Sequence, residues 1–432
     1  MTLHIFNPDH DLALASGLEN FTAPHAGRQL RHDLAWLPAL WAEDGDTVIV
    51  DSEEQAQRGM TRLKRLAKQM PAKNFSTIRF GLSRNLIGQL EGLTGQLEPL
   101  IGQLEPLIGQ LDASTAQLGQ AARIQPTAIA PWGWNAALRA QLIRTGVSET
   151  LLPTLQQMDA IRRLSHRRTA AQLLKQLREA SPSQDLTGTA TECFTIEEVE
   201  SLILQQPRLV LKAPWSSSGR GVRFVAGSLN DSVTGWLRNV IRQQGSIMAE
   251  PYYNKVKDFG MEFTSDGMGH VSYLGLSLFH TQNGAYTGNL LATETYKQEI
   301  LSRYLPASLL TNVQESICRL LSPTIGQLYK GPFGIDMMVV SGANPIDRLS
   351  AERHLPEKEA QIPILHPCVE INLRRTMGHV ALALTRLINP QNDDELVKVM
   401  RIVYEDNQYK LKCNNSPFPN KNTGKKTRQH TF

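Results

Sequence analysis

The sequence lacks the marks of several large protein classes. Its four cysteines are widely spaced and no C-x-x-C pair occurs, so neither a zinc site nor a disulfide framework is expected. No apolar run reaches the roughly 18 residues that a membrane-spanning helix needs. The basic and apolar pattern of a signal peptide is also missing near residue 1. These absences lead us to expect a reduced, cytoplasmic protein without a membrane partner.

An excess of charge of one sign is missing as well. The 45 lysines and arginines nearly balance the 41 aspartates and glutamates, which leaves a net charge of +4. This balance does not indicate nucleic-acid binding, and 41% hydrophobic with 20% charged residues is ordinary for a globular enzyme. A chain of 432 residues is long enough for about two or three domains. We therefore expect small-molecule partners and no nucleic acid, while the oligomeric state stays open.

The segment 209–222, LVLKAPWSSSGRGV, is the most informative part of the chain. An apolar run leads into Lys212 and is followed by a loop of serines and glycines. Such a loop exposes backbone N–H groups and can fold closely over an anion, and a lysine binds phosphate as a point charge. The pattern predicts a strand and a loop that together bind a nucleoside triphosphate. A plain turn between two strands is the alternative.

Two common nucleotide-binding fingerprints do not explain this segment. A P-loop has its lysine after the glycines, whereas Lys212 precedes Gly219 and Gly221. A dinucleotide-binding G-x-G-x-x-G motif fails because Phe224 occupies the third glycine position.

The next segment, 246–263, supplies groups suited to the rest of a nucleotide. An apolar strand ends at Glu250, and Tyr252 and Tyr253 follow a proline. Backbone groups and aromatic rings in such a segment can frame an adenine. Asp258 begins a second alternating strand, and its carboxylate can accept hydrogen bonds from ribose hydroxyls.

Three oxygen-bearing side chains further along are candidates for a metal site. Asp336 lies within the apolar strand 331–340, where an unpaired carboxylate is costly. Glu370 and Asn372 are two residues apart, so at strand spacing both point to the same face. Hard oxygen ligands of this kind suit Mg²⁺ shared with substrate phosphates, and Mn²⁺ is an alternative.

In this order the motifs resemble those of the ATP-grasp superfamily, in particular its carboxylate–amine ligase branch. The resemblance covers roughly residues 155–390 and consists of K-x-P-x-S-S-S-G-x-G-V, a hinge E-P-Y, G-x-D in a strand, and E-x-N-x-R. It implies an α/β (α+β) fold in which two mixed lobes clamp ATP and an N-terminal α/β domain precedes them.

The resemblance also implies a role for each matching position. The implied phosphate contact and lid are Lys212 with Ser216, Ser217, Ser218, Gly219 and Gly221; the adenine and ribose contacts are Glu250, Tyr252, Tyr253 and Asp258; the metal ligands are Asp336, Glu370 and Asn372. Arg374 would face the transferred phosphate or the acceptor carboxylate.

One position departs from the family pattern, in which a lysine or arginine before the lid touches the α-phosphate. Here the segment 164–169 reads LSHRRT and opens a helix expected at 170–178, with Ser165 as its N-cap. His166, Arg167 and Arg168 compete for the role, and we favour Arg167. The alternative is that all three are solvated charges of the first helical turn.

Residues 1–150 are expected to form a separate front domain. Strands at 3–6 and 47–50, with a helix between them, predict a parallel sheet. The loop 7–11 follows the first strand, where such sheets place ligands, so Asp9, His10 and Asp11 are candidates for substrate contact. The alternative is an ordinary turn in which Asp11 caps a helix.

The rest of the chain divides into a lid and adenine-binding lobe at 151–265, a metal- and acceptor-binding lobe at 266–412, and a disordered basic tail at 413–432. Residues 88–115 repeat a seven-residue unit that contains Pro99 and Pro106, so a long coiled coil is not expected. We place this repeat in an exposed insertion at 88–122, with binding of a partner protein as the alternative.

Three smaller predictions concern packing and loops. Trp132 and Trp134 precede a helix at 136–144 and are expected to pack the front domain onto the next lobe, or else to form a substrate platform. Thr195 with Glu198 forms a capping box for a helix that ends at 205. The segment 276–293 is typical of a functional loop, in which His280 contacts substrate or acts as an acid or base. A surface hairpin is the alternative.

These features predict an ATP- and magnesium-dependent ligase. The resemblance implies that an acceptor carboxylate attacks the γ-phosphate of ATP, and that an amine then displaces phosphate from the acylphosphate. Lys212, Arg374 and His280 are the candidate catalytic residues, and a small carboxylate and an amine are the expected partners. Two other functions stay open: an ATP-grasp kinase, and a nucleotide-binding regulatory protein without catalysis.

Overall fold

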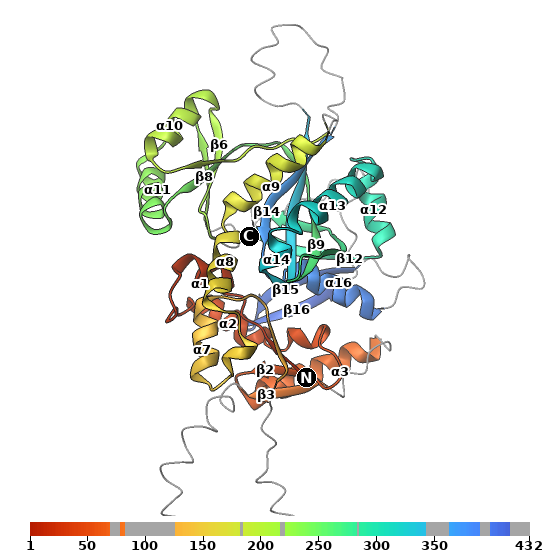
Figure 1. Ribbon diagram of the computed structural model, residues 1–432. Helices are drawn as coiled ribbons and strands as arrows, with labels where there is room; N and C mark the ends of the chain where they lie inside the picture. Colours follow the sequence, from red (N-terminus) through yellow and green to blue (C-terminus); the bar gives the residue numbers. More distant parts are fainter. Residues whose placement is uncertain are drawn as a thin grey trace, which may run out of the picture.

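The computed structural model describes residues 1–69, 78–82, 126–181, 185–216, 221–282, 285–342, 363–388 and 398–414. These residues form four four-stranded sheets with helices packed around them (Figure 1). The predicted repeat at 88–115, its insertion at 88–122 and the tail beyond Asn414 lie outside this part of the chain. The predicted fold class, a mixed α/β chain with an N-terminal α/β domain, is confirmed.

The front domain contains a parallel sheet in the order β3-β2-β1-β4. Its strands are β1 (Thr2–Ile5), β2 (Thr47–Val50), β3 (Arg79–Leu82) and β4 (Ala128–Pro131). Its helices are α1 (His10–Ser16), α2 (His25–Leu34), α3 (Glu53–Gln69), α7 (Ala136–Arg144) and the short turns η1 (Leu37–Leu40) and η3 (Glu149–Leu151). The predicted strands at 3–6 and 47–50 and the helix at 136–144 are therefore confirmed.

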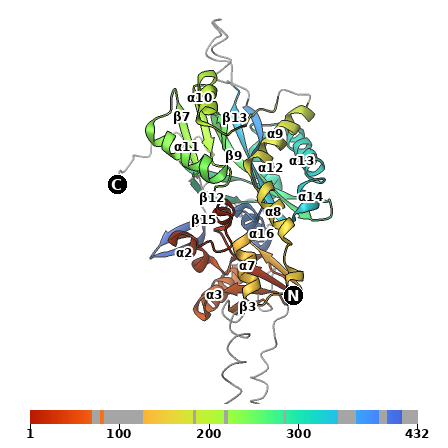
Figure 2. The same cartoon turned by 60° about the vertical axis from the view of Figure 1, so that its left-hand side comes forward.

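A second sheet forms a separate lobe, called here the lid lobe, which lies at the end of the molecule opposite α3 (Figures 1 and 2). Its antiparallel strands run in the order β5 (Thr191–Cys193), β8 (Ile247–Pro251), β6 (Arg208–Lys212) and β7 (Val222–Ala226). Helices α10 (Ile196–Gln205) and α11 (Asp231–Gln244) cover it, and Val199, Leu211 and Leu237 are central to its own apolar core. The predicted capping box of Thr195 and Glu198 is confirmed.

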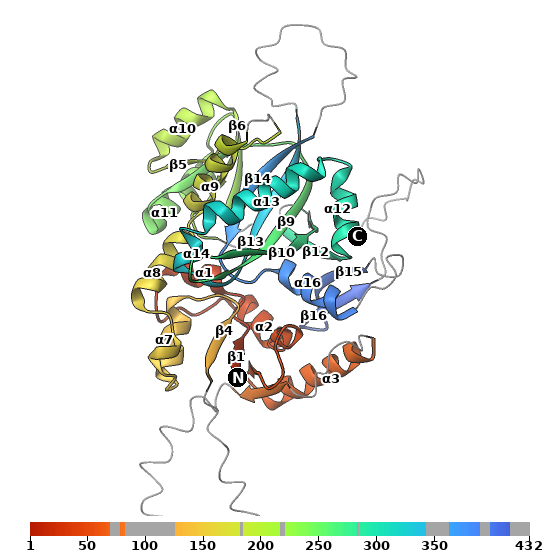
Figure 3. The same ribbon diagram turned by 45° about the vertical axis from the view of Figure 1, so that its right-hand side comes forward.

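The third, central sheet carries most of the candidate metal ligands. Its antiparallel strands are β10 (Val271–Ser277), β9 (Lys255–Asp266), β13 (Lys330–Ser341) and β14 (Pro363–Asn372), in that spatial order. The helices around it are α8 (Leu155–Leu164), α9 (Arg167–Ala180), α12 (Glu294–Ser302), α13 (Ala307–Leu321) and α14 (Ile325–Leu328), and α9 lies beside α13 (Figure 3). Phe263 stacks on Phe333 in the core at a ring-centroid distance of 5.4 Å.

The fourth sheet joins the end of the chain to the front domain. It contains β11 (Phe279–Gln282), β12 (Ala285–Leu291), β15 (Lys398–Glu405) and β16 (Gln408–Asn414), with α16 (Met377–Ile388) packed against β12. Trp132 lies in one buried apolar cluster with Phe6, Leu291 and Val380. Trp132 therefore packs the front domain onto the part of the chain beyond residue 285, and not onto the lobe at 151–265 that was expected.

Several local predictions are corrected by these elements. Helix α9 begins at Arg167 with His166 as its N-cap, and Ser165 instead ends α8, because its hydroxyl donates back to the Ile161 carbonyl. Asp9, not Asp11, is the N-cap position of α1.

Two predicted irregular segments contain regular strands. The segment 276–293 contains the hairpin of β11 and β12, which was the alternative to a functional loop. Cys413 and Asn414 belong to β16 rather than to a disordered tail, because they pair with Met400 and Val399. No helix in the described ranges is long and apolar enough to cross a membrane.

Because Phe263 lies in the central core, we expect its removal to lower the stability of the fold strongly. Its ring is completely buried and stacked, so Phe263→Ala should lower the free energy of unfolding by about 3–5 kcal/mol. Phe224→Ala is the matched control, since that ring is 63% exposed and should change stability by about 0.5 kcal/mol or less. Chemical denaturation followed by circular dichroism would measure both. Equal destabilisation by the two variants would contradict this account of the core.

Candidate nucleotide and metal site

The strand register collects four polar side chains on one face of the central sheet. Asp336 of β13 lies opposite Gly260 of β9 and Glu370 of β14. Two residues before it, Gly334 lies opposite Glu262 and Asn372. Because paired residues and residues two apart share a face, Glu262, Asp336, Glu370 and Asn372 all project to the same side. Glycines at 260 and 334 leave room for them.

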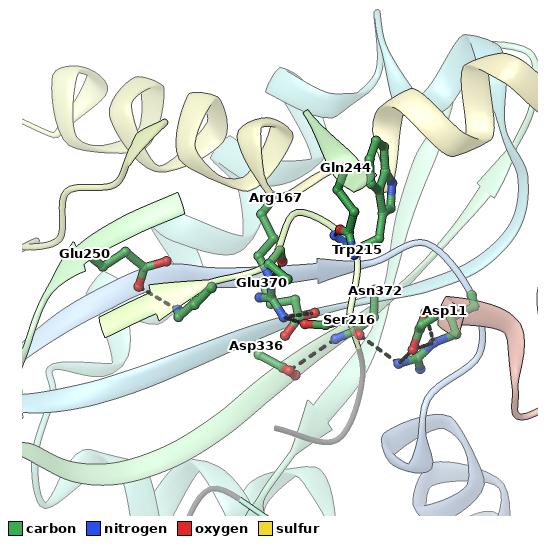
Figure 4. Close-up of polar contacts among 12 residues, drawn as sticks. Asp11, Arg167, Trp215, Ser216, Gln244, Glu250, Asp336, Glu370 and Asn372 are labelled. Atoms are coloured by element: carbon green, nitrogen blue, oxygen red, sulfur yellow. Dashed lines mark hydrogen bonds and ion pairs between the residues drawn. The ribbon is translucent and has the colours of Figure 1, made fainter. Parts of the chain in front are cut away.

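Asp336 is the most strongly perturbed carboxyl group of this face. Protein surrounds it closely, so desolvation raises its pKa to about 8, and the negative charges of Glu370 and Glu262 add to the shift. The Asn372 side-chain amide donates a hydrogen bond to Asp336 Oδ2 at 3.1 Å (Figure 4). Within the described ranges Asp336 has no ion pair with a lysine or an arginine. Its negative charge is therefore poorly compensated.

Arg167 reaches the site from the first turn of α9. Its Nη2 lies 2.9 Å from Glu370 Oε1 and 3.2 Å from the Ser216 hydroxyl, and its Nε donates to the Ala213 carbonyl at 3.0 Å (Figure 4). The other two candidates of this segment turn elsewhere. Arg168 pairs with Glu192, and His166 lies edge-on against Trp215 with its pKa lowered to about 4, first by burial and then by Arg168.

Lys212 and Glu250 face each other in the lid lobe. The ammonium Nζ donates to Glu250 Oε2 at 2.5 Å, and both side chains are buried. The register of β6, β7 and β8 puts Lys212 and Glu250 on one sheet face together with Phe224. Tyr252 lies at the rim of that face, where its ring contacts Arg208 and Phe224. A phosphate that binds Lys212 must therefore compete with the Glu250 carboxylate.

Arg374 connects the site to the front domain. Its Nε and Nη2 donate to the Asp11 carboxylate at 2.7–3.0 Å, and Nη2 also donates to Asn372 Oδ1 at 3.0 Å. Burial alone would raise the pKa of Asp11, but Arg374, together with His10 and Arg167, outweighs burial and lowers it. Since Nη1 donates to the Arg375 carbonyl, one Nη1 hydrogen remains for a ligand. Most of the hydrogen-bonding capacity of Arg374 thus goes to positioning Asn372 and Asp11.

The hairpin of β11 and β12 meets β9 near the candidate ribose contact. The Thr281 hydroxyl donates to Asp258 at 2.5 Å, and Lys255 Nζ lies 2.6 Å from the same carboxylate. His280 is the neighbouring residue, and its pKa is lowered by burial and then by Lys257, so the imidazole is neutral at pH 7. Because Thr281 and Lys255 both contact its carboxylate, Asp258 is already engaged on the side of the hairpin.

Only some of the other predicted site residues lie in the described part of the chain. Ser217, Ser218 and Gly219 lie outside the described residues. Ser216 contacts Arg167, and the Gly221 carbonyl accepts the Ala213 N–H at 2.8 Å. Tyr253 lies edge-on to His366 at 5.4 Å, and its hydroxyl accepts the Thr189 N–H. A small cavity between Asp11, Trp215, Ser216, Glu370 and Asn372 adjoins these groups.

Glu262 is a site-face residue that the sequence analysis missed. It is 3% exposed, and its Oε2 lies 2.9 Å from His379 Nδ1 of α16. The spacing Asp258, Gly260, Glu262 in an alternating strand is the signal that places Glu262 on the face of Asp258. That signal was present, but Glu262 lies in none of the recognised motifs.

The donor set fits a divalent cation of the magnesium type. Asp336, Glu370 and Asn372 present carboxylate and amide oxygens on one face, and the pKa of Asp336 is raised first by burial and then by the Glu370 and Glu262 carboxylates. No group of three or more histidine, cysteine, aspartate or glutamate side chains with metal-site geometry occurs among the described residues.

Comparison with known proteins finds similarity at the level of structure only. No protein-family model and no curated protein matches the chain. Staphylococcus aureus N5-carboxyaminoimidazole synthetase in complex with ADP is similar at 12% identity and a TM-score of 0.41, with 94% of this chain and 83% of that chain covered. Campylobacter jejuni biotin carboxylase is similar at 11% identity and a TM-score of 0.44, with 93% and 75% covered.

A third similar structure is the RimK domain protein ATP-grasp of Sphaerobacter thermophilus, at 16% identity and a TM-score of 0.32, with 61% of this chain and 81% of that chain covered. Its name is that of the superfamily which the sequence motifs resemble. Because these TM-scores lie below 0.5, the similarities carry no argument about the site.

The perturbed carboxyl group predicts a pH-dependent effect of Asp336→Asn. A pKa raised to about 8 means that the folded protein keeps this proton while the unfolded chain, with an ordinary pKa, loses it. The resulting stabilisation is complete below about pH 4 and is lost as the pH rises through about 8. The variant should therefore melt at a higher temperature than the wild type at pH 8.5 and at a similar temperature at pH 4.5, without divalent cations.

Thermal denaturation at both pH values measures this difference. Millimolar MgCl₂ should reduce the difference in melting temperature between the variant and the wild type at pH 8.5, since a bound cation would compensate the wild-type carboxylate. An offset in melting temperature that is the same at both pH values would contradict the raised pKa of Asp336.

Proposed function

We propose that this chain is an ATP-dependent ligase that joins a carboxylate to an amine through an acylphosphate. The observation that carries the proposal is the arrangement of two opposed sets of groups. Asp336, Glu370 and Asn372 lie on one face of the central sheet, and Arg167 brings positive charge against Glu370 from the start of α9. Lys212 adds a second positive charge from the lid lobe. A triphosphate with a divalent cation has the charge pattern that would fit between them.

In the proposed complex, Lys212 and Arg167 neutralise phosphate oxygens, while Asp258 binds the ribose and the segment from Glu250 to Tyr253 binds the base. Asp336, Glu370 and Asn372 would hold Mg²⁺, which when bound supplies charge neutralisation for the phosphates. Phosphoryl transfer of this kind depends mainly on positioning and on electrostatic stabilisation. The lid then has to exclude water, since an acylphosphate hydrolyses readily.

The order of the motifs and the geometry support different parts of the proposal. The E-x-N-x-R motif favours the ligase branch over a kinase, and the oxygen-rich site face supports catalysis over nucleotide binding alone. Similar solved structures include a synthetase with bound ADP and a biotin carboxylase with an ATP analogue.

The proposal predicts ATP turnover that requires both a carboxylate and an amine. Purified protein with ATP and MgCl₂ would be screened against mixtures of small carboxylates, with hydroxylamine as the amine probe because it traps acylphosphates as coloured hydroxamates. Lys212→Ala should lower hydroxamate formation by about 10²-fold, the size expected for loss of one preorganised charge contact. Lys175→Ala is the matched control, since Lys175 lies on the exposed face of α9 with its side chain 77% exposed.

The products distinguish the proposed ligase from its alternatives. A ligase releases ADP and phosphate with the hydroxamate, whereas a kinase releases ADP with one hydroxyl compound and no free phosphate. ATP binding without turnover on any mixture would favour a regulatory protein. Full activity of Lys212→Ala would contradict the phosphate-binding role of that lysine.

A further inference from the structure

Glu262 is a buried carboxylate on the site face that the proposed nucleotide and metal contacts do not use. It is 3% exposed, and its Oε2 accepts no hydrogen bond from the described residues. His379 Nδ1 lies 2.9 Å from Oε2. That nitrogen accepts the Thr376 N–H at 3.1 Å, and the other ring nitrogen lies 3.3 Å from the Phe263 carbonyl. In this tautomer Nδ1 has no hydrogen to donate to Oε2, so the short contact becomes an attraction only when a proton lies between the two groups.

The position of this oxygen is tightly defined. A methyl group added at Gly334 would lie 2.5 Å from Oε2, so Oε2 lies directly over the middle strand β13. A methyl group at Gly378 would lie 1.8 Å from Oε1, so the carboxylate is also held against the first turn of α16. Substitution of either glycine would displace Glu262. The two glycines thus allow a carboxylate to lie between β13 and α16.

Glu262 lies beyond Asp336 when the site face is followed from the candidate ribose contact Asp258. Asp258, Gly260 and Glu262 follow one another on β9, so Asp258 and Glu262 are separated by about 13 Å along the strand. Asp336 lies level with Gly260, between them. A nucleotide with its ribose at Asp258 and its phosphates near Asp336 would point its γ-phosphate toward Glu262. A buried carboxylate oxygen without a partner is costly there unless a proton or a cationic group binds it.

We infer that Glu262 binds the ammonium group of the amine substrate and takes up one of its protons. This inference rests on the proposed function. An N–H bond of the ammonium group breaks and the proton passes to Glu262 Oε2. The neutral nitrogen then attacks the acyl carbon, an amide C–N bond forms, and the C–O bond to phosphate breaks. The phosphate leaving group takes up the second proton of the nitrogen.

The chemical class of the second substrate follows from this site. A primary amine or ammonia is almost entirely protonated at pH 7, because an alkylammonium group has a pKa of roughly 10. It therefore needs both a negative group to bind it and a base to deprotonate it, and one carboxylate with a free oxygen can do both. A substrate that is already neutral would need neither.

The charged and titratable groups that face Glu262 come from each neighbouring element. His379 lies on α16, Asp336 on β13, Tyr273 on β10 and Lys297 on α12, and the last three interact with Glu262 electrostatically. Lys297 Nζ donates to the Leu276 carbonyl at 2.8 Å and pairs with Glu294. Glu294 also accepts from Tyr273 and the Leu276 N–H. Both carboxylate oxygens of Glu294 thus have polar partners, whereas Oε2 of Glu262 accepts no hydrogen bond from the described residues.

The test compares two amine probes on Glu262→Gln, in the full chain with ATP, MgCl₂ and the carboxylate found by the hydroxamate screen. Hydroxylamine is largely unprotonated at neutral pH, whereas ammonium and methylammonium are charged. We expect hydroxamate formation to stay close to the wild-type rate. Amide formation from ammonium or methylammonium should fall by about 10²-fold at pH 7, the range of general acid–base catalysis.

The pH profile provides a readout that a structural role would not change. Amide formation by Glu262→Gln should rise tenfold per pH unit as free amine accumulates, while the wild-type rate levels off. Glu294→Gln is the matched control, because it removes a carboxylate charge from the same layer without removing a free oxygen. Glu262→Asp keeps the base on a shorter side chain, and should retain a measurable part of the amide activity if Glu262→Gln fails to fold.

The outcomes separate this inference from the proposed function. If Glu262→Gln loses both reactions or neither while the wild type forms hydroxamate, the ligase stands and the role of Glu262 is wrong. Equal loss of amide formation in Glu294→Gln would also overturn the role of Glu262. If the wild type forms no hydroxamate with any carboxylate, the proposed function fails and the inference fails with it.

Discussion

The need to compensate buried negative charge governs the organisation of this molecule. Four acidic or amide side chains share one face of the central sheet, and each carboxylate removed from water requires a partner. Glu370 has Arg167, Asp11 has Arg374, and Glu250 has Lys212. Asp336 and Glu262 are left with the weakest compensation. These two are the positions where a cation or a proton would contribute most, and they are also the positions that the chemistry proposed here uses.

Each compensating cation comes from a different part of the chain. Arg167 is at the start of α9, Lys212 is in the lid lobe, and Arg374 follows β14 and binds the front domain. The Arg167–Glu370 and Arg374–Asp11 pairs join α9 and the front domain to the end of the central strand β14, whereas the Lys212–Glu250 pair lies within the lid lobe. They also limit what the cations can do, since Arg374 has one Nη1 hydrogen left for a ligand and Lys212 is already paired. A role for Arg374 in positioning Asn372 accounts for its contacts better than direct capture of a substrate anion.

The resemblance of the motifs to a known family implied the fold class. Local patterns predicted the parallel front sheet, the helix at 136–144 and the strands that carry Asp336, Glu370 and Asn372, because a single segment contains such a pattern. The N-cap position predicted for Ser165 was wrong, and the hairpin formed of the two alternatives for 276–293, because tertiary pairing decided between them. Glu262 was missed for a related reason: a carboxylate in an alternating strand looks solvent-facing until the register across β13 shows what lies opposite. The roles proposed for the site residues stay predictions.

The apolar cluster around Trp132 has a consequence for how this protein is made. It combines Phe6, Leu34 and Val48 with Val380, Leu384 and Met400, so residues from both ends of the chain complete one core. A ribosome releases the front residues long before those near 400. The front domain therefore cannot complete this core until almost the whole chain has been synthesised, and part of the apolar surface of its parallel sheet stays exposed until then.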